Sequence, residues 1–156
     1  DITGFDFAAN GKHADGIGMK LYTMHLPMIL NHYGTQLLAW NPQLNEQLLV
    51  KALNSWLDLA DEALATLDDY RYPTPDMAHQ ISASAQIRKI KTASSQSIKT
   101  HTIAHSYGPV EDFETRLRLA VDNTPDGVWL NRYAYLDDQK YKIQQEYLNE
   151  KNIQSV

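Results

Sequence analysis

Two stretches of sequence decide the fold: Thr100-His-Thr-Ile-Ala-His-Ser-Tyr-Gly-Pro109 and Asp126-Gly-Val-Trp-Leu-Asn-Arg-Tyr-Ala-Tyr135. Each begins as a β-like run and ends in polar and aromatic side chains, and a helix-patterned stretch lies between them. Strands separated by helices pair in parallel through right-handed crossovers, and they present functional groups at their carboxyl ends. The pattern therefore predicts an α/β fold with a site at these strand ends.

The rest of the chain adds more helix than strand. We expect a first strand at residues 2–8, a loop at 12–18, and helices at 28–40, 41–67, 76–93, 110–121 and 136–149. Two further strands are predicted at 98–107 and 128–135. The prediction is a helix-dominated α/β fold with three to five short parallel strands. An all-α bundle is the alternative, because helical pattern covers most of the length.

The longest predicted helix runs from Asn41 to Leu67. Asn41 is a natural N-cap, and Pro42 suits the first helical position. Apolar residues recur at helical spacing at Leu44, Leu48, Ala52, Leu53, Trp56, Leu57, Ala60, Ala63, Leu64 and Leu67. We expect this stripe to pack in the core and not to form a binding groove.

The composition is that of an ordinary globular protein. The chain has 156 residues, of which 43% are hydrophobic and 21% charged, so we expect a single domain or an excised part of a larger α/β domain. It begins with Asp1 and not with methionine, which predicts a processed or excised piece. No apolar run approaches the roughly 18–20 residues of a membrane span. We expect a soluble protein, and the sequence leaves its compartment open.

Charge and cysteine content argue against several functions. The formal net charge is −5 and no long basic run is present, which argues against a nucleic-acid partner. The chain has no cysteine, so disulfides, thiolate zinc sites, Fe–S clusters and cysteine nucleophiles are excluded.

Cofactor and metal motifs are incomplete. Gly16-Ile-Gly18 lacks the third glycine of a dinucleotide-binding loop, since Leu21 occupies that position. His101 and His105 have the spacing of helical metal ligands, but on the predicted strand they lie too far apart to bind one ion together. We therefore expect neither a cofactor nor a metal.

Residues 103–135 resemble the final βα units of sugar-processing (β/α)8 barrels. The resemblance rests on His105-Ser-Tyr-Gly-Pro after one strand and on Gly127-Val-Trp-Leu-Asn-Arg-Tyr in the next. Gly4-Phe-Asp-Phe resembles an earlier barrel strand that ends in a carboxylate. A complete barrel needs roughly 200–250 residues. The resemblance therefore implies part of a barrel, or a smaller open-sheet protein, that acts on carbohydrate.

Glycoside hydrolysis needs one protonated and one ionised carboxyl group about 5–10 Å apart. We expect Asp6 to form this pair with Asp68 or Asp69. The side chains expected to bind sugar hydroxyls or to stack on a sugar ring are Tyr70, Arg71, His105, Tyr107, Trp129, Asn131, Arg132 and Tyr133. The predicted function is carbohydrate binding or hydrolysis by paired carboxylates, with a sugar or another small molecule as the ligand.

A structural role for the same residues is the alternative. Asp6 would cap a turn, Asp68 and Asp69 would lie at a solvated helix end, and Arg132 would pair with a surface carboxylate. The protein would then be a non-enzymatic helical interaction or oligomerisation module. Its interface would be formed by helix 41–67 and the tyrosine-rich segments 70–72 and 133–147. An incomplete βα array would also leave an open sheet edge, so we expect a homo-oligomer or a larger parent protein.

Overall fold

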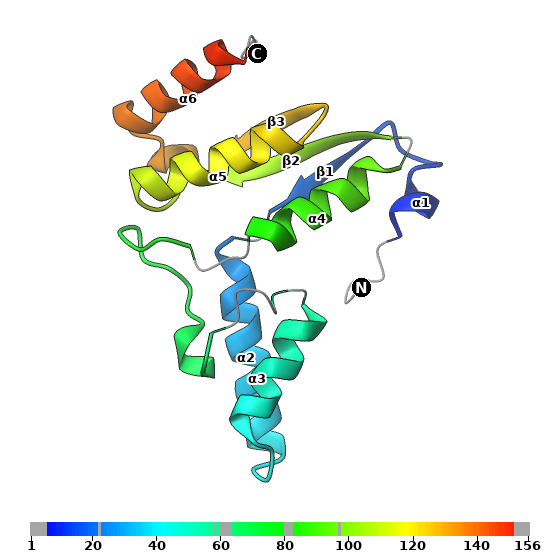
Figure 1. Ribbon diagram of the computed structural model, residues 1–156, viewed down its shortest axis with the longest axis vertical. Helices are drawn as coiled ribbons and strands as arrows, with labels where there is room; N and C mark the ends of the chain where they lie inside the picture. Colours follow the sequence, from blue (N-terminus) through cyan, green and yellow to red (C-terminus); the bar gives the residue numbers. More distant parts are fainter. Residues whose placement is uncertain are drawn as a thin grey trace. The chain divides into compact units, whose positions relative to one another are not determined.

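The structure is a computed structural model that describes residues 6–21, 23–57, 59, 64–79, 83–96 and 98–151. The chain forms two compact units (Figure 1). Unit 1 contains Asp1–Leu21 and Gln86–Val156, and unit 2 contains Tyr22–Ala85. Each unit has its own hydrophobic core and is described by itself. None of the described helices is long and apolar enough to cross a membrane.

Unit 1 is built on a three-stranded parallel sheet in the order β1-β2-β3. Its strands are β1 (Gly16–Lys20), β2 (Lys99–His105) and β3 (Gly127–Asn131). Helix α5 (Val110–Asn123) connects β2 to β3 (Figure 1). This confirms the predicted helix-dominated α/β fold with three parallel strands and excludes the all-α alternative.

One face of the sheet carries the core of unit 1. Met19 of β1 and Ala104 of β2 pack there against Ile90 of helix α4 (Ala83–Ser94) and Ala120 of α5. Side chains alternate between the two faces of a strand, so every second residue of each strand points toward these helices. Helices α4 and α5 therefore cover the same face.

We call the opposite face of the sheet the open face. Glycines lie on this face in both outer strands. Gly18 of β1 and Gly127 of β3 lie on either side of His101 in the register. Trp129 lies one face position further along β3, and its side chain is 65% exposed. Parallel sheets are usually covered on both faces. An exposed indole is therefore unusual on a sheet of this kind.

Helix α6 (Asp138–Glu150) packs on α5 through Tyr147, which joins Phe113 and Leu117 in a second buried cluster. Its N-cap is Asp137, whose carboxylate accepts a hydrogen bond from the backbone N–H of Lys140 at 2.9 Å. The sequence predicted this helix at 136–149, and the prediction is confirmed to within two residues.

Unit 2 is a helical hairpin followed by a short 3-10 helix. The elements are α2 (His25–Trp40), α3 (Glu46–Trp56) and η2 (Leu67–Asp69). Leu30, Val50 and Leu67 from the three elements meet in one core cluster. Gly34 permits the close approach of α2 and η2, because a Cβ there would lie 2.2 Å from Leu67 Cδ2.

The helix predicted at 41–67 is wrong at both ends. Helix α3 begins after Asn45, whose side chain accepts a hydrogen bond from the Leu48 backbone N–H at 3.0 Å. Asn41 instead closes the preceding turn by accepting from the Gln43 backbone N–H at 3.2 Å. The helix ends at Trp56 and residues 64–66 are not helical, while residues 58 and 60–63 of the predicted range lie outside the described residues. Both asparagines are good N-caps, but Asn41 stabilises the turn and Asn45 caps the helix.

The apolar stripe of α3 is also buried differently from the prediction. Val50 and Leu53 enter the core of unit 2. Leu48 and Trp56, which we expected in the core, are 68% and 57% exposed. Helix α3 therefore has apolar residues on two opposite sides, and only one side packs against α2.

Strand β1 was not predicted, because its residues Gly16 and Gly18 have poor strand propensity. The loop predicted at 12–18 is wrong for its last three residues, because Gly16–Lys20 form β1. The strand predicted at 2–8 is wrong where it is described, since Phe7–Asn10 form the short helix α1; residues 1–5 lie outside the described residues.

Two further predicted elements have other bounds in the structure: one helix begins later than predicted, and one strand ends earlier. Of the helix predicted at 76–93, residues 76–79 are not helical and α4 begins at Ala83, with 80–82 outside the described residues. The strand predicted at 128–135 ends at Asn131. Arg132 breaks the strand with a left-handed backbone, and Tyr133–Tyr135 form the 3-10 helix η3.

Candidate functional site

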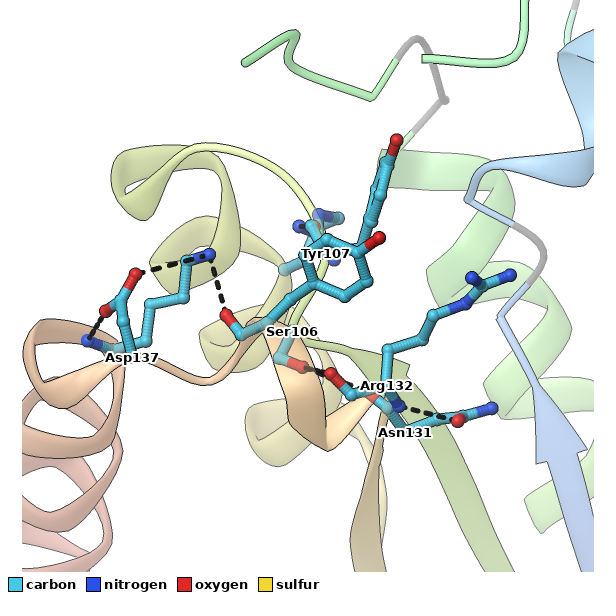
Figure 2. A network of polar contacts seen from close by, with 8 residues as sticks. Ser106, Tyr107, Asn131, Arg132 and Asp137 are labelled. Atoms are coloured by element: carbon cyan, nitrogen blue, oxygen red, sulfur yellow. Dashed lines mark hydrogen bonds and ion pairs between the residues drawn. The ribbon is translucent and has the colours of Figure 1, made fainter. Parts of the chain in front are cut away.

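Ser106 ties the carboxyl ends of β2 and β3 together (Figure 2). Its backbone N–H donates to the Asn131 carbonyl at 3.0 Å. Its Oγ lies 3.0 Å from the same carbonyl oxygen and 2.5 Å from that of Arg132. The Asn131 side chain accepts a hydrogen bond from the Arg132 N–H at 2.6 Å. Ser106 is buried, so these bonds fix the two strand ends relative to each other.

Arg132 is held in a conformation that side chains disfavour. Its backbone is left-handed, with φ 65° and ψ 48°, which costs a non-glycine residue about 1–2 kcal/mol. Among the residues the structure describes, no other non-glycine residue has a positive φ. Strain of this kind persists where the surroundings enforce it, and it collects at functional sites.

Aromatic rings gather beside the Arg132 guanidinium (Figure 2). The Arg132 Cζ lies 5.9 Å from the centre of the Tyr107 ring, within the range of a cation–π contact. Tyr107 in turn meets the Tyr135 ring edge to face, with centroids 4.7 Å apart. We call Ser106, Tyr107, Asn131, Arg132 and Tyr135 the strand-end cluster.

Arg116 braces the end of β2 from helix α5. Its guanidinium donates to the His105 carbonyl at 2.6 Å and to the Tyr107 carbonyl at 2.5 Å, and Asp112 binds it at 2.9 Å. Burial lowers the pKa of Arg116, while the Asp112 carboxylate opposes that effect. Arg116 is not among the site residues predicted from the sequence. Its signal is a basic side chain between the inward-facing Phe113 and Leu117, four residues after an aspartate.

Lys140 fixes the far side of the strand-end cluster (Figure 2). Its ammonium group donates to the Tyr135 carbonyl at 3.0 Å and lies 3.7 Å from Asp137. Asp112 and Asp137, the carboxylates of this edge, thus each hold a structural cation. The edge offers aromatic rings and the hydrogen-bond donors of the Arg132 guanidinium.

The open face continues the site away from the strand ends. The His101 and Trp129 rings lie 6.3 Å apart at 48°. The His101 Nδ1 is buried and has no hydrogen-bond partner among the described residues. A Cβ on Gly127 would lie 3.1 Å from that nitrogen, so the glycine makes room for the imidazole.

The structure brings together Tyr107, Asn131 and Arg132 of the predicted sugar-binding residues. Trp129 lies on the open face, and Tyr133 follows Arg132 with its side chain 82% exposed. His105 lies on the same strand face as His101, but its side chain is buried. Of these six residues, Trp129 lies in the middle of β3, and the other five lie at or just after the carboxyl ends of β2 and β3, as the carboxyl-end rule predicts.

Tyr70 and Arg71 belong to unit 2, where their described contacts are structural. The Tyr70 hydroxyl donates to Asn54 Oδ1 at 2.7 Å and accepts from the Leu64 N–H at 2.7 Å, so this side chain is part of the core. The Arg71 Nε donates to the Asp68 carbonyl at 2.7 Å. The two bonds of Tyr70 connect it to α3 and to the segment before η2, and the bond of Arg71 closes the end of η2.

Two of the three predicted catalytic carboxylates, Asp69 and Asp6, have local structural roles. Asp69 accepts hydrogen bonds from the side chain and backbone of Thr66, and these bonds lower the pKa of its carboxyl. Asp6 caps α1 by accepting from the Ala9 N–H at 3.0 Å. Asp6 lies in unit 1, whereas Asp68 and Asp69 lie in unit 2. Their pairing in one catalytic site stays a prediction.

The described residues contain no group of three or more metal-ligating side chains that could hold an ion. No protein-family model, curated protein or solved structure matches this chain. The residues themselves therefore carry the functional argument.

Proposed function

We propose that unit 1 binds a carbohydrate at the strand-end cluster and on the adjoining open face. The observation that carries this proposal is the strained Arg132, held by Ser106 and Asn131 beside the ring of Tyr107. An arginine with a left-handed backbone lowers the stability of the fold. Contact between its guanidinium and a ligand would explain why arginine is nevertheless found at this position.

The chemistry of the surface suits a sugar. Sugars present C–H groups on one face and hydroxyls around the rim, and sites for such ligands combine aromatic rings with a few well-placed polar groups. Trp129 and Tyr133 offer exposed rings, while Arg132 offers hydrogen-bond donors and Asn131 a side-chain amide. The His101 imidazole, in the space that Gly127 leaves open, lies 6.3 Å from the Trp129 ring.

The topology supports the same proposal. Consecutive parallel strands with α4 and α5 on one face are also how successive units of a (β/α)8 barrel are arranged, and binding sites of that fold lie at the carboxyl ends of its strands. This is the arrangement implied by the resemblance of residues 103–135 to sugar-processing barrels.

Hydrolysis is the finer proposal and requires two carboxyl groups in different states. The predicted pair is Asp6 with Asp68 or Asp69, of which one carboxyl would have to be protonated and the other ionised. Replacing Asp6 by asparagine should then abolish hydrolysis of a bound substrate and leave its binding intact, whereas a binding protein shows no hydrolysis to lose.

Thermal unfolding against neutral and acidic mono- and oligosaccharides tests the proposal. A sugar at about one hundred times its Kd should raise the Tm by roughly 2–4 °C or more for a chain of this size. At the same sugar concentration the rise should fall to about half in Trp129→Ala, since a tenfold higher Kd removes about half of the stabilisation, and it should be unchanged in Trp56→Ala, an exposed tryptophan of unit 2. A panel that leaves the Tm unchanged, or a rise that is just as large in Trp129→Ala, would overturn the proposed site.

A further inference from the structure

The open face of the sheet is basic, although the chain as a whole is acidic. Partners in the parallel register lie on the same face of the sheet, so the pairing of the strands assigns its positions. The positions on the open face are Gly16, Gly18, Lys20, Lys99, His101, Ile103, His105, Gly127, Trp129 and Asn131. Lys20 and Lys99 carry positive charge, and none of these positions carries a carboxylate. The formal net charge of the chain is −5, so the open face differs in sign from the chain as a whole.

The charge of Lys99 has no counter-charge beside it. Two carboxylates lie close to the strands in the sequence, Asp15 before β1 and Asp126 before β3. Asp126 accepts a hydrogen bond from the Thr100 backbone N–H at 2.6 Å, so the backbone of β2 holds this carboxylate. The side chain of Lys99 is exposed and forms no ion pair with the residues that the structure describes. A cation in this state attracts an anionic ligand.

His101 adds a hydrogen-bonding group beside the exposed indole. A Cβ on Gly16 would lie 3.9 Å from His101 Cδ2, and a Cβ on Gly127 would lie 3.1 Å from Nδ1, so the imidazole stands between two glycines. Its Nδ1 is buried, which leaves Nε2 as the ring nitrogen that a ligand can reach. The Trp129 ring lies 6.3 Å away at 48°. The open face thus combines an aromatic surface, a hydrogen-bonding nitrogen and positive charge.

The spacing of these groups indicates the size of the ligand. Residues two positions apart on one strand are separated by about 6.6 Å, and neighbouring strands by about 4.8 Å. Lys20 and Trp129 pair with the same residue of β2, so their backbones are about 10 Å apart across the sheet. Lys99 lies four positions before that residue, and its backbone is about 14 Å from that of Trp129. A ligand that covers the indole and meets both lysines is therefore longer than one sugar ring.

We propose that the ligand of the open face is an acidic oligosaccharide, with one ring on Trp129 and negatively charged groups of the neighbouring rings at Lys20 and Lys99. This inference rests on the proposed carbohydrate site and names the class of sugar that it binds. The C–H face of one ring covers the indole, and His101 bonds to a hydroxyl at its rim. Charge complementarity favours an acidic sugar over a neutral one, because the face presents cations and no carboxylate.

Matched pairs of sugars test the role of charge. Trisaccharides of galacturonic, glucuronic and mannuronic acid are compared with their methyl esters, which keep the rings and remove the charge. Isothermal titration calorimetry should show at least one acid whose Kd is about tenfold lower than that of its ester. The difference should disappear when the ionic strength rises from about 0.01 M to about 1 M, since the Debye length then falls from about 30 Å to about 3 Å.

A single substitution locates the charge effect on the open face. Lys99→Gln should raise the Kd of the acid about three- to fivefold, the range expected of an exposed ion pair, and leave that of the ester unchanged. Lys91→Gln is the matched control, because it changes the net charge equally at an exposed lysine of α4, the helix on the other face. This control should change neither Kd. Far-ultraviolet circular dichroism verifies that both variants are folded.

The outcomes separate this inference from the proposed function. Equal Kd values within every pair would overturn the acidic ligand and leave a carbohydrate site in place, whereas a panel in which no sugar binds would remove both. An effect of Lys91→Gln as large as that of Lys99→Gln would show that net charge, and not the open face, attracts the ligand. A single-stranded oligonucleotide that binds more tightly than every acidic sugar would also overturn the inference.

Discussion

At the scale of the residue, Arg132 separates backbone strain from side-chain function. Arg132→Gly and Arg132→Ala both remove the guanidinium, but only glycine adopts φ 65° at no cost. We expect Arg132→Gly to be more stable than Arg132→Ala by about 1 kcal/mol, measured by urea unfolding. Both variants should lose sugar-induced stabilisation to the same extent. Equal stabilities would show that the left-handed backbone stores no strain.

Trp129 is the second residue whose role can be measured directly. Its exposed ring on the open face contributes little to the core, so Trp129→Ala should change the free energy of unfolding by less than about 0.5 kcal/mol. Removal of a stacking ring should raise the Kd for a bound sugar about tenfold, as measured by isothermal titration calorimetry. Trp129→Phe, which keeps a ring, should recover part of the loss, and a variant with unchanged Kd would remove Trp129 from the site.

The sequence predicts some site residues and hides others for a physical reason. Tyr107, Asn131 and Arg132 follow strands directly, so the carboxyl-end rule finds them without any tertiary information. Ser106 and Arg116 act through bonds to backbone carbonyls, and every residue has a carbonyl. A bond to a backbone carbonyl therefore cannot be predicted from the identity of the residue that accepts it.

At the scale of the element, local signals predict those helices and strands whose ends they determine. Strand β2 and helices α5 and α6 have capping or turn residues at their boundaries, and the structure confirms them. Strand β1 was missed because Gly16 and Gly18 have poor strand propensity. Its order comes from pairing with β2, a contact between residues about eighty positions apart. Helix α3 shows the converse, since its apolar spacing predicts burial on a side that the structure leaves exposed.

The contact between α2 and η2 predicts that one substitution, Gly34→Ala, has opposite effects on stability with and without the Leu67 side chain. Gly34→Ala raises helix propensity by about 1 kcal/mol, but its methyl group would lie 2.2 Å from Leu67 Cδ2, an overlap that costs about 1–3 kcal/mol. We expect Gly34→Ala to destabilise the unmodified chain and to stabilise the Leu67→Ala variant. A double-mutant cycle in urea measures both effects. Stabilisation by the same amount in both backgrounds would contradict the close contact.

At the scale of the whole molecule, ionised groups limit the pH range of stability. Hydrogen bonds from Thr66 and Thr74 lower the pKa values of Asp69 and Asp76, and Lys151 and Tyr147 lower that of Asp122. Burial and the Asp122 carboxylate raise the pKa of Tyr147, while Asp122 raises that of Lys151. Asp122 is thus the one residue of this set that affects stability at both low and high pH, through its own pKa and through those of Tyr147 and Lys151.

A lowered carboxyl pKa contributes stability above the unfolded value of 3.8, and this stability is lost as the pH falls through the folded value. The raised pKa values of Tyr147 and Lys151 contribute stability below their unfolded values of 10.0 and 10.5, which is lost at higher pH. Urea midpoints should therefore decline on both sides of neutrality. Asp122→Asn should make both declines shallower and lower the midpoint at pH 7, whereas the exposed control Asp15→Asn should change neither. If both declines persist unchanged in Asp122→Asn, the bond that the Tyr147 hydroxyl donates from α6 to Asp122 on α5 is not formed in solution.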